Sequence, residues 1–332
     1  SADHCTAPGV YPISVDNPTD GPCLPYDFTV DYLLKTSTGQ EKCFDGTMLV
    51  DCSTMTTSSA DWGQDGNYPD YNFYFDNGDQ TVTDEVSGLM WQKCLVGQTG
   101  DTCTGVASGY DWQGAIDYCD GLSFADHDDW RLPDYHELSG LLYYDEYNPC
   151  IDETVFPSVS NSMNWTSDTF MVTSPMGMFT SFAAGTVANS TKTTLFAIRC
   201  VRGSTPQVAD RYVEMGGAGD EVVLDLATGL VWQKAYVASG TWSGALADCE
   251  ALTLGGFEDW RLPNIAELRS LMDMSLVNPS STFPGIEESQ LWSSTSISDL
   301  PGNAFTQITD NGLHNPVAKT NFSAYRCVRG GL

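Results

Sequence analysis

The stretch Asp129-Trp130-Arg131-Leu132-Pro133 decides how this chain is organised, because it occurs twice. It returns 130 residues later as Asp259-Trp260-Arg261-Leu262-Pro263. Each copy is followed by an Asx residue with a glutamate three places on, in Asp134-x-x-Glu137 and Asn264-x-x-Glu267. Such a pair caps a helix start reciprocally, side chain to backbone at both positions. Each copy therefore predicts a short helix directly after the proline.

Further matches extend in both directions and always keep the same order. They pair 88–93 with 229–234, 112–119 with 242–249, 148–149 with 278–279, 156–157 with 283–284, 165–167 with 292–294, and 199–203 with 326–330. The chain is therefore a tandem duplication of two domain-sized copies. We call residues 81–203 repeat 1, residues 208–331 repeat 2, and the unrepeated residues 1–80 the leader.

The charge balance is strongly acidic. The 332 residues carry 44 Asp plus Glu against 14 Lys plus Arg, a formal net charge of −30. Such a surface repels nucleic acid and anionic membranes, and it suits cations or a cationic partner. The simpler interpretation is that the charge keeps an extracellular protein soluble. No apolar run approaches the length of a membrane span, so direct membrane insertion is not expected.

Cysteine usage indicates an oxidising compartment. Of eleven cysteines, one pair recurs in each repeat, which argues for disulfides Cys119–Cys200 and Cys249–Cys327 between the first helix and the last strand. Close spacing predicts two local bridges, Cys94–Cys103 in an insertion of repeat 1 and Cys43–Cys52 in the leader. Cys5, Cys23 and Cys150 remain, with Cys5–Cys23 and Cys23–Cys150 both open. We expect a secreted or surface-displayed chain whose mature start is Ser1.

Two acidic segments of the leader are dense in oxygen ligands. Asp61 and Asp65 lie in one of them, and Asp76 and Asp79 lie in the other. Ca²⁺ takes six to eight oxygens from such groups, so these four aspartates are the candidate calcium ligands. The spacing is not that of an EF-hand loop. The alternative is a set of Asx and Gly turns.

Each repeat opens with a predicted strand pair, 80–84 with 88–92 and 222–226 with 229–233. An amphipathic helix follows, because Trp112 and Trp242 each begin a run of apolar residues at helical spacing. After the second helix the pattern becomes irregular before short closing strands.

The motif order Gly-Leu-Met-Trp-Gln-Lys, Trp-x-x-Ala, Asp-Trp-Arg-Leu-Pro-x-x-x-Glu-Leu, Asn-Pro, Phe-Pro, Trp-(Ser/Thr)-Ser and Arg-Cys-Val-Arg-Gly resembles the Lcl C-terminal domain family of bacterial surface and secreted proteins. The resemblance covers both repeats. It implies an α+β class with two tandem C-type-lectin-like domains, preceded here by a small disulfide-tied β-rich leader. It also implies adhesin-like binding. A sulfated ligand would need a cationic surface, which this chain lacks.

The repeated arginines and tryptophans have a functional and a structural interpretation. Six of eight arginines recur between the copies, and an anion site is one use for them. Pairing with buried carboxylates such as Glu137 and Glu267 is the other, and the shared flanking residues favour it. The repeated tryptophans are interpreted in the same way, as core rather than as sugar-stacking platforms.

Partner contacts are expected where the repeats differ. The Met-rich segment 170–190 of repeat 1 is predicted to form an apolar contact loop through Met171, Met178 and Phe179. The matching segment 296–315 is polar, and we predict that its Asp310, Asn311 and His314 line a solvent-exposed, ligand-facing loop.

The four histidines have no zinc spacing, and no nucleophile or phosphate-loop motif is present, so we expect no catalysis. The expected function is recognition of carbohydrate or a surface polymer by a secreted or cell-surface protein. The alternative is a structural subunit of an extracellular filament or appendage that assembles with copies of itself through the leader. A hypervariable surface display protein is a further alternative.

Overall fold

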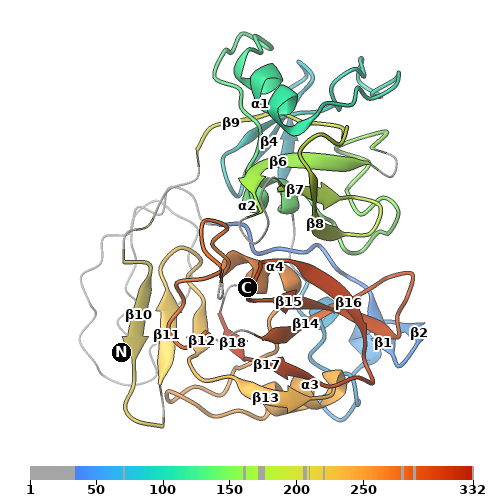
Figure 1. Ribbon diagram of the computed structural model, residues 1–332. Helices are drawn as coiled ribbons and strands as arrows, with labels where there is room; N and C mark the ends of the chain where they lie inside the picture. The colour runs from blue at the N-terminus through green and yellow to red at the C-terminus, as the bar shows by residue number, and fades with distance from the viewer. Residues whose placement is uncertain are drawn as a thin grey trace, which may run out of the picture. The chain divides into compact units, whose positions relative to one another are not determined.

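A computed structural model describes residues 34–69, 72–159, 162–170, 176–204, 208, 210–219, 221–277, 280–286 and 289–330 (Figure 1). These residues belong to the compact unit that spans residues 32–332. Most of the regular structure is β: the described residues form eighteen strands and four α-helices. Within the described ranges, no helix is long and apolar enough to cross a membrane.

Repeat 1 builds two antiparallel sheets. The first has the order β3 (Tyr74–Asp76), β4 (Thr81–Asp84), β5 (Met90–Gln92) and β9 (Val201–Arg202). The second has the order β6 (Met163–Thr169), β7 (Met176–Ser181) and β8 (Thr186–Thr191). The predicted opening strand pair is confirmed by β4 and β5, and β3 adds an edge strand that begins before residue 81.

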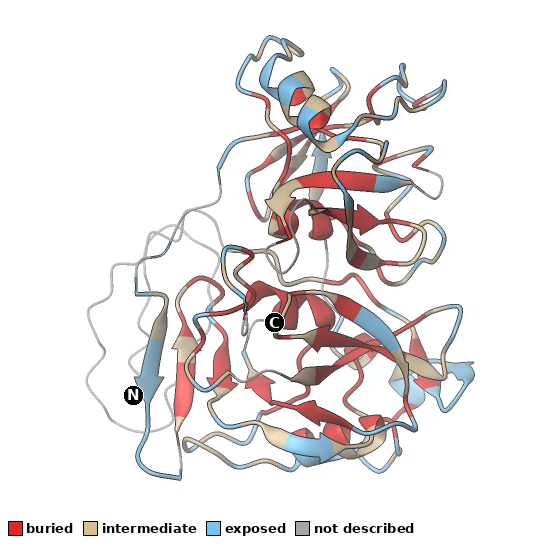
Figure 2. Ribbon diagram, viewed as in Figure 1, coloured by how far each residue is buried: buried red, intermediate tan, exposed pale blue. Residues whose placement is uncertain are grey.

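Repeat 2 builds the same two sheets, and strands β13 and β17 extend the second one. The first has the order β10 (Tyr212–Met215), β11 (Val222–Asp225), β12 (Val231–Gln233) and β18 (Val328–Arg329). The second has the order β13 (Val237–Gly240), β17 (Ser323–Tyr325), β14 (Gln290–Ser296), β15 (Asn303–Ile308) and β16 (His314–Ala318). Strands β7, β14 and β15 are almost entirely buried (Figure 2).

The helices are short. They are α1 (Trp112–Asp120), α2 (Tyr135–Ser139), α3 (Trp242–Glu250) and α4 (Ile265–Ser270). Both predicted capping boxes are confirmed at the starts of α2 and α4. Gly121 and Gly140 end the two helices of repeat 1 after nine and five residues.

The expected α+β, C-type-lectin-like class is wrong, because the described chain is mostly β with four short helices. The segments that were predicted to be irregular form strands β6–β8 and β14–β16 instead. Their sequences are rich in Ser and Thr, which hides the strand pattern. Threonine nevertheless fits a pleated, half-buried surface well.

The described part of the leader is a hairpin followed by two 3-10 turns. Its elements are β1 (Cys43–Asp45), β2 (Met48–Val50), η1 (Cys52–Thr54) and η2 (Asp65–Asn67). The predicted bridge Cys43–Cys52 closes the hairpin. The other three predicted disulfides, Cys94–Cys103, Cys119–Cys200 and Cys249–Cys327, are also formed. Cys150 is a buried free thiol, while Cys5 and Cys23 lie outside the described residues.

The leader is bound to both repeats. Lys35 pairs with Asp84 of repeat 1 at 3.3 Å, and both side chains are almost fully buried. Further along, Asp61 accepts a hydrogen bond from Ser243 Oγ of repeat 2 at 2.6 Å. Trp62 Nε1 donates to Glu250 on α3. The leader that precedes repeat 1 therefore packs largely against repeat 2.

The two repeats share their apolar core. Ile265 and Phe305 of repeat 2 pack in one cluster with Leu138 of repeat 1. Hydrogen bonds cross as well, from Tyr135 Oη to the Gly312 carbonyl at 2.7 Å. This continuity fixes the position of α2 and α4, which carry the candidate site.

Candidate functional site

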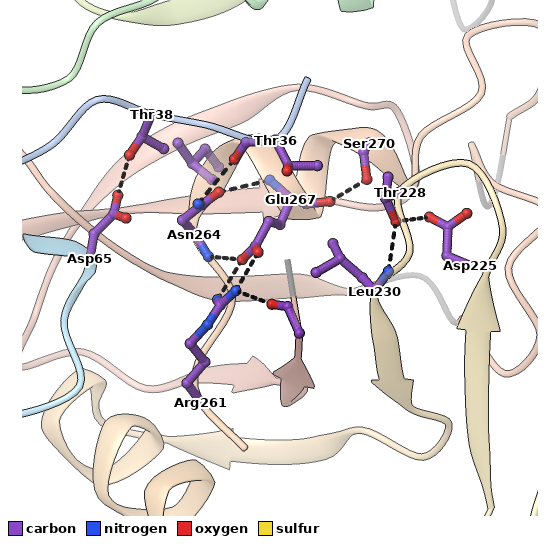
Figure 3. Close-up of polar contacts among 12 residues, drawn as sticks. Thr36, Thr38, Asp65, Asp225, Thr228, Leu230, Arg261, Asn264, Glu267 and Ser270 are labelled. Carbon is purple, nitrogen blue, oxygen red and sulfur yellow. Dashed lines mark hydrogen bonds and ion pairs between the residues drawn. The ribbon is translucent and has the colours of Figure 1, made fainter. Parts of the chain in front are cut away.

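The N-terminal end of α4 in repeat 2 is covered by the leader (Figure 3). Asn264, the cap of α4, donates from Nδ2 to the Thr36 carbonyl at 3.1 Å. The Thr38 hydroxyl donates to Asp65 Oδ2 at 2.9 Å. The Thr295 hydroxyl of β14 donates to the same oxygen at 2.6 Å. We call the space beside Asn264, Thr295 and Tyr144 that the leader fills the repeat 2 slot.

The leader lies in this slot without regular secondary structure. The Thr38 carbonyl accepts from Tyr144 N at 2.9 Å. Gln40 Nε2 donates to the carbonyls of Tyr144 and Ser296, at 3.2 and 2.8 Å, and its Oε1 accepts from Ser296 N at 3.0 Å. The Gln40 amide thus pairs with both the N–H and the carbonyl of Ser296, as the backbone of a neighbouring strand would. The slot therefore binds the leader through the slot's own main-chain groups, at Tyr144 and Ser296.

The equivalent place in repeat 1 is a cavity of about 380 Å³. By the repeat offsets, Asp134 and Asp168 of repeat 1 correspond to Asn264 and Thr295 of repeat 2. Each slot also takes one residue from the other copy: Met274 of repeat 2 corresponds to Tyr144 of repeat 1. Asp134, Asp168 and Met274 line the cavity, together with His136, Arg211, Asp273 and other residues. We call this cavity the repeat 1 slot.

The repeat 1 slot is acidic. The positive charge of Arg211 is paired with the buried carboxylate of Asp225, to which Arg211 donates two hydrogen bonds of 2.6 Å. Burial lowers the pKa of His136 to about 4, so the imidazole is neutral near pH 7. Its Nε2 lies 2.9 Å from the Met272 carbonyl. The carboxylates that line the slot are therefore not balanced by a free cation among the lining residues that the structure describes.

Two of these carboxyl groups, at Asp134 and Asp168, have raised pKa values. Burial, and after it the charge of Asp134, raise the pKa of the Asp168 carboxyl to about 7, against the hydrogen bond from Tyr135 N. Burial also raises the pKa of Asp134, although its carboxylate caps α2 through Glu137 N. Like charges in a partly desolvated site behave in this way, and a cation placed between them would stabilise both.

The repeated Trp-Arg-Leu-Pro motif has a structural role next to each slot. Arg131 donates to both oxygens of Glu137 at 2.7 and 2.6 Å, and Arg261 makes the same pair with Glu267. The two arginines also bridge to Val201 and Val328, which lie in the closing strands. The predicted pairing with carboxylates is confirmed.

The comparisons with known proteins agree with this repeated geometry. The family model described as the Lcl C-terminal domain matches residues 80–202 and 221–329. The chain belongs to the Lcl C-terminal domain family. A comparison with curated proteins gives no match. The two Lcl C-terminal domains thus account for most of the chain, and the leader and the 203–220 connection lie outside them.

The other repeated arginines of the Lcl C-terminal domains also serve the fold. Arg199 and Arg326 are buried against the rings of Phe156 and Phe283, at 4.6 and 4.5 Å from the ring centroids. The remaining pair, Arg202 and Arg329, bind Asp129 and Asp259 at 2.6 Å. These contacts leave no shared anion site.

The repeated tryptophans of the Lcl C-terminal domains are core residues with one exception. Seven of the eight are buried, and Trp112 is only partly buried. Lys192 lies 3.3 Å from the centre of the Trp112 ring, as Lys319 lies over Trp242. Leader residue Phe44 covers the repeat 2 arrangement, with its ring 5.7 Å from the Lys319 amine.

The four candidate calcium ligands do not form one site. Asp61 and Asp65 are buried and bind hydroxyl and amide donors of the leader and repeat 2. Asp76 accepts from Gly78 N and Asp79 from Thr81 N, which are Asx turns. In the described ranges there is no group of three or more His, Cys, Asp or Glu that could hold a metal.

The predicted apolar contact loop of repeat 1 is wrong where the structure describes it. Met178 and Phe179 lie in the middle strand β7, hydrogen-bonded on both sides, and are 0% and 8% exposed. Met178 belongs to one apolar cluster with Leu268 of repeat 2, so its side chain is covered by the chain itself. Met171 lies outside the described residues.

The predicted ligand-facing loop of repeat 2 is not an open loop either. His314 is fully buried and starts β16, with its Nε2 2.9 Å from the Gly185 carbonyl of repeat 1. Asp310 and Asn311 are half-buried in the β15–β16 turn, where Asn311 accepts from Leu313 N. Hairpin pairing and contact with repeat 1 fix these residues.

The slot residues were missed from the sequence, although a signal was present. Asp134 and Asp168 are acidic where the second copy has neutral Asn264 and Thr295, so a comparison of charge between the copies singles them out. The sequence does not show that Tyr135 N and Asp168 meet, since they are 33 positions apart.

Asp168→Asn is expected to raise the melting temperature by a few degrees at pH 8.5. The folded-state pKa lies above the ordinary aspartate value, so ionised Asp168 destabilises the fold above about pH 7. That cost fades as pH falls toward 4, because the folded state binds the proton first. The gain of the variant should therefore shrink between pH 8.5 and pH 5 in thermal scans.

Asp129→Asn is the matched control, since the Arg202 guanidinium lowers the pKa of Asp129. It should raise the melting temperature at no pH in this range. A gain for Asp168→Asn that is the same at pH 5 and pH 8.5 would mean that ionisation of the Asp168 carboxyl does not destabilise the folded state.

Proposed function

We propose that this chain acts by binding rather than catalysis, as an adhesin-like protein outside the cell. The observation that carries the proposal is the repeat 1 slot, an acidic cavity that none of the described residues fills, in the copy whose counterpart is filled. The polar and aromatic residues that both copies share are used in the fold. A slot built from the unshared residues is therefore the place where a ligand would bind.

An extracellular location is part of the proposal. Four disulfides stabilise the described chain, two of them across whole repeats. Disulfides persist in oxidising surroundings and are rare in reducing ones. The net charge of −30 favours neutral or cationic ligands over sulfated ones.

A carbohydrate or other surface polymer is the first candidate ligand, because carboxylates readily accept hydrogen bonds from hydroxyl groups. Assembly with other proteins into an extracellular structure is the second. One observation favours the second candidate, namely that repeat 2 already holds a polypeptide segment, the leader, at the equivalent place.

The test uses the full disulfide-bonded chain and the double variant Asp134→Asn/Asp168→Thr, which gives repeat 1 the residues of repeat 2. The control is Asp101→Asn/Asp120→Asn, which removes the same charge from exposed positions. Retention on intact bacterial cells and on immobilised cellulose, chitin and chitosan is measured for each protein. Retention that only the slot variant loses supports the proposal. Equal retention by all three proteins, or none by any, would contradict it.

Solution size distinguishes the two ligand classes. Light scattering across a hundredfold range of concentration should show growth of the assembly if copies of this chain are the partner. A monomer at every concentration argues against self-assembly and leaves attachment to a polymer or to a different protein.

A further inference from the structure

The repeat 2 slot shows how this fold binds a peptide segment. Two backbone carbonyls of the leader, at Thr36 and Thr38, accept from Asn264 Nδ2 and Tyr144 N. Asp145 Oδ1 accepts from Glu41 N and Lys42 N, at 3.0 and 2.8 Å. The Gln40 and Asp65 side chains of the leader add to these main-chain contacts. A segment of another sequence that offers the same main-chain groups and suitable polar side chains could be held in the same way.

The repeat 1 slot keeps the framework of this arrangement. Its helix cap is Asp134 and its strand end is Asp168, both of repeat 1. Met274, which follows α4 of repeat 2, completes it, and all three correspond to residues of the repeat 2 slot. The arginine–glutamate pair next to each slot differs in how far it is exposed to solvent. The Arg131 side chain is 34% exposed, whereas the Arg261 side chain beside the leader is 6% exposed.

The polarity of the slot is changed at its two contact points. Asn264 donates a hydrogen bond to the leader through its amide, and Asp134 has no such donor when ionised. Thr295 donates to the leader carboxylate Asp65, and Asp168 replaces that hydroxyl by a carboxylate. An occupant of the repeat 1 slot must therefore bring donors, and a positive charge satisfies both carboxylates at once.

We propose that the repeat 1 slot captures an extended segment of a partner protein that carries lysine or arginine. This inference rests on the proposed binding function and names its partner class. A leader from a second copy fits poorly, because its Asp65 would meet Asp168. The net charge of −30 attracts a basic segment from a distance.

A bare cation explains the slot less well. Ca²⁺ needs six to eight oxygen ligands, and the described residues offer no group of three acidic or imidazole side chains around one point. A side-chain ammonium or guanidinium needs only the two carboxylates, while the rest of its segment pairs with the strand end at Asp168, as Gln40 pairs at Ser296.

The test measures fluorescence anisotropy of an end-blocked, labelled octapeptide of alternating lysine and threonine with the full chain at pH 8. The same peptide with glutamate in place of lysine, a chitosan tetramer and CaCl₂ are compared as competitors. The lysine peptide should bind, with a Kd at least tenfold weaker for Asp134→Asn/Asp168→Thr and unchanged for Asp101→Asn/Asp120→Asn. The slot variant is checked by its melting curve, and its residues are those that repeat 2 tolerates at the same positions.

Each other outcome overturns the inference in a recognisable way. An equal loss in both variants would mean non-specific attraction to an acidic protein. Binding or competition by chitosan alone makes the slot a polysaccharide site and leaves the proposed function standing. Displacement by CaCl₂ beyond that of NaCl at the same ionic strength assigns the slot to a metal ion. No binding by any probe, together with no retention on cells, removes the proposed function as well.

Discussion

Arg261→Met is expected to lower the free energy of unfolding by about 3–5 kcal/mol, because it leaves a buried carboxylate without its partner. Glu267 is 2% exposed and receives two hydrogen bonds from Arg261, at 2.7 and 2.6 Å. It cannot turn to water, since the same carboxylate accepts from Asn264 N to cap α4. The guanidinium also donates to the Gly330 carbonyl, so the closing strand loses a contact too.

The chain contains its own control for this experiment. Arg131→Met breaks the same bidentate pair with Glu137 in repeat 1, where the arginine is 34% exposed rather than 6%. The Glu137 and Glu267 side chains are equally buried, but the space that the half-exposed Arg131 side chain leaves opens to water, so the loss should be smaller, about 1–2 kcal/mol. Urea denaturation of the two disulfide-bonded variants at pH 7 compares them. Equal losses would mean that burial by the leader does not strengthen the pair in repeat 2.

The difference between these two arginines shows what the sequence could and could not predict. Both pairs follow from the repeated motif, since each arginine precedes a capping glutamate by six positions. The motif is local, and local patterns also predicted the helix caps, the opening strand pairs and the core tryptophans. The cover over Arg261 is not local. It comes from leader residues such as Asp65, which meets Thr295 across 230 positions.

The same distinction explains the errors. Met178 and Phe179 were expected in a contact loop because they lie in a Met-rich segment where the two repeats differ. They form the middle of a three-stranded sheet, whose pairing with β6 and β8 depends on register rather than composition. His314 was expected at the surface for a similar reason, and contact with Gly185 of the other repeat buries it. Contacts between the copies cannot be read from either copy alone.

The candidate site combines both kinds of information. The duplication makes the exchange of Asn264 for Asp134 visible in the sequence. Only the structure shows that the neutral residue binds the leader while the acidic one faces a cavity. Function in a duplicated chain is then best sought where one copy has a filled slot and the other has one that no described residue fills.

Cys249→Ala/Cys327→Ala is expected to cost about 4–5 kcal/mol, one of the largest losses available from two substitutions in this chain. The bridge joins residues 78 positions apart, and closing so long a loop removes much conformational entropy from the unfolded chain. Both sulfurs are buried between α3 and the closing strand, so removing the bridge also leaves space in the repeat 2 core. Urea denaturation, followed by tryptophan fluorescence, measures the loss.

Cys94→Ala/Cys103→Ala provides the comparison, because that bridge spans only 9 positions and the same entropy relation gives about 2.5 kcal/mol. A short-loop variant that loses more than the long-loop variant would show that native packing around the sulfurs, rather than loop closure, sets the stability.

The long bridge also bears on location. If Cys249 and Cys327 alkylate as free thiols in protein taken directly from its source, the chain does not depend on an oxidising compartment, and the argument for an extracellular binding protein loses its chemical basis.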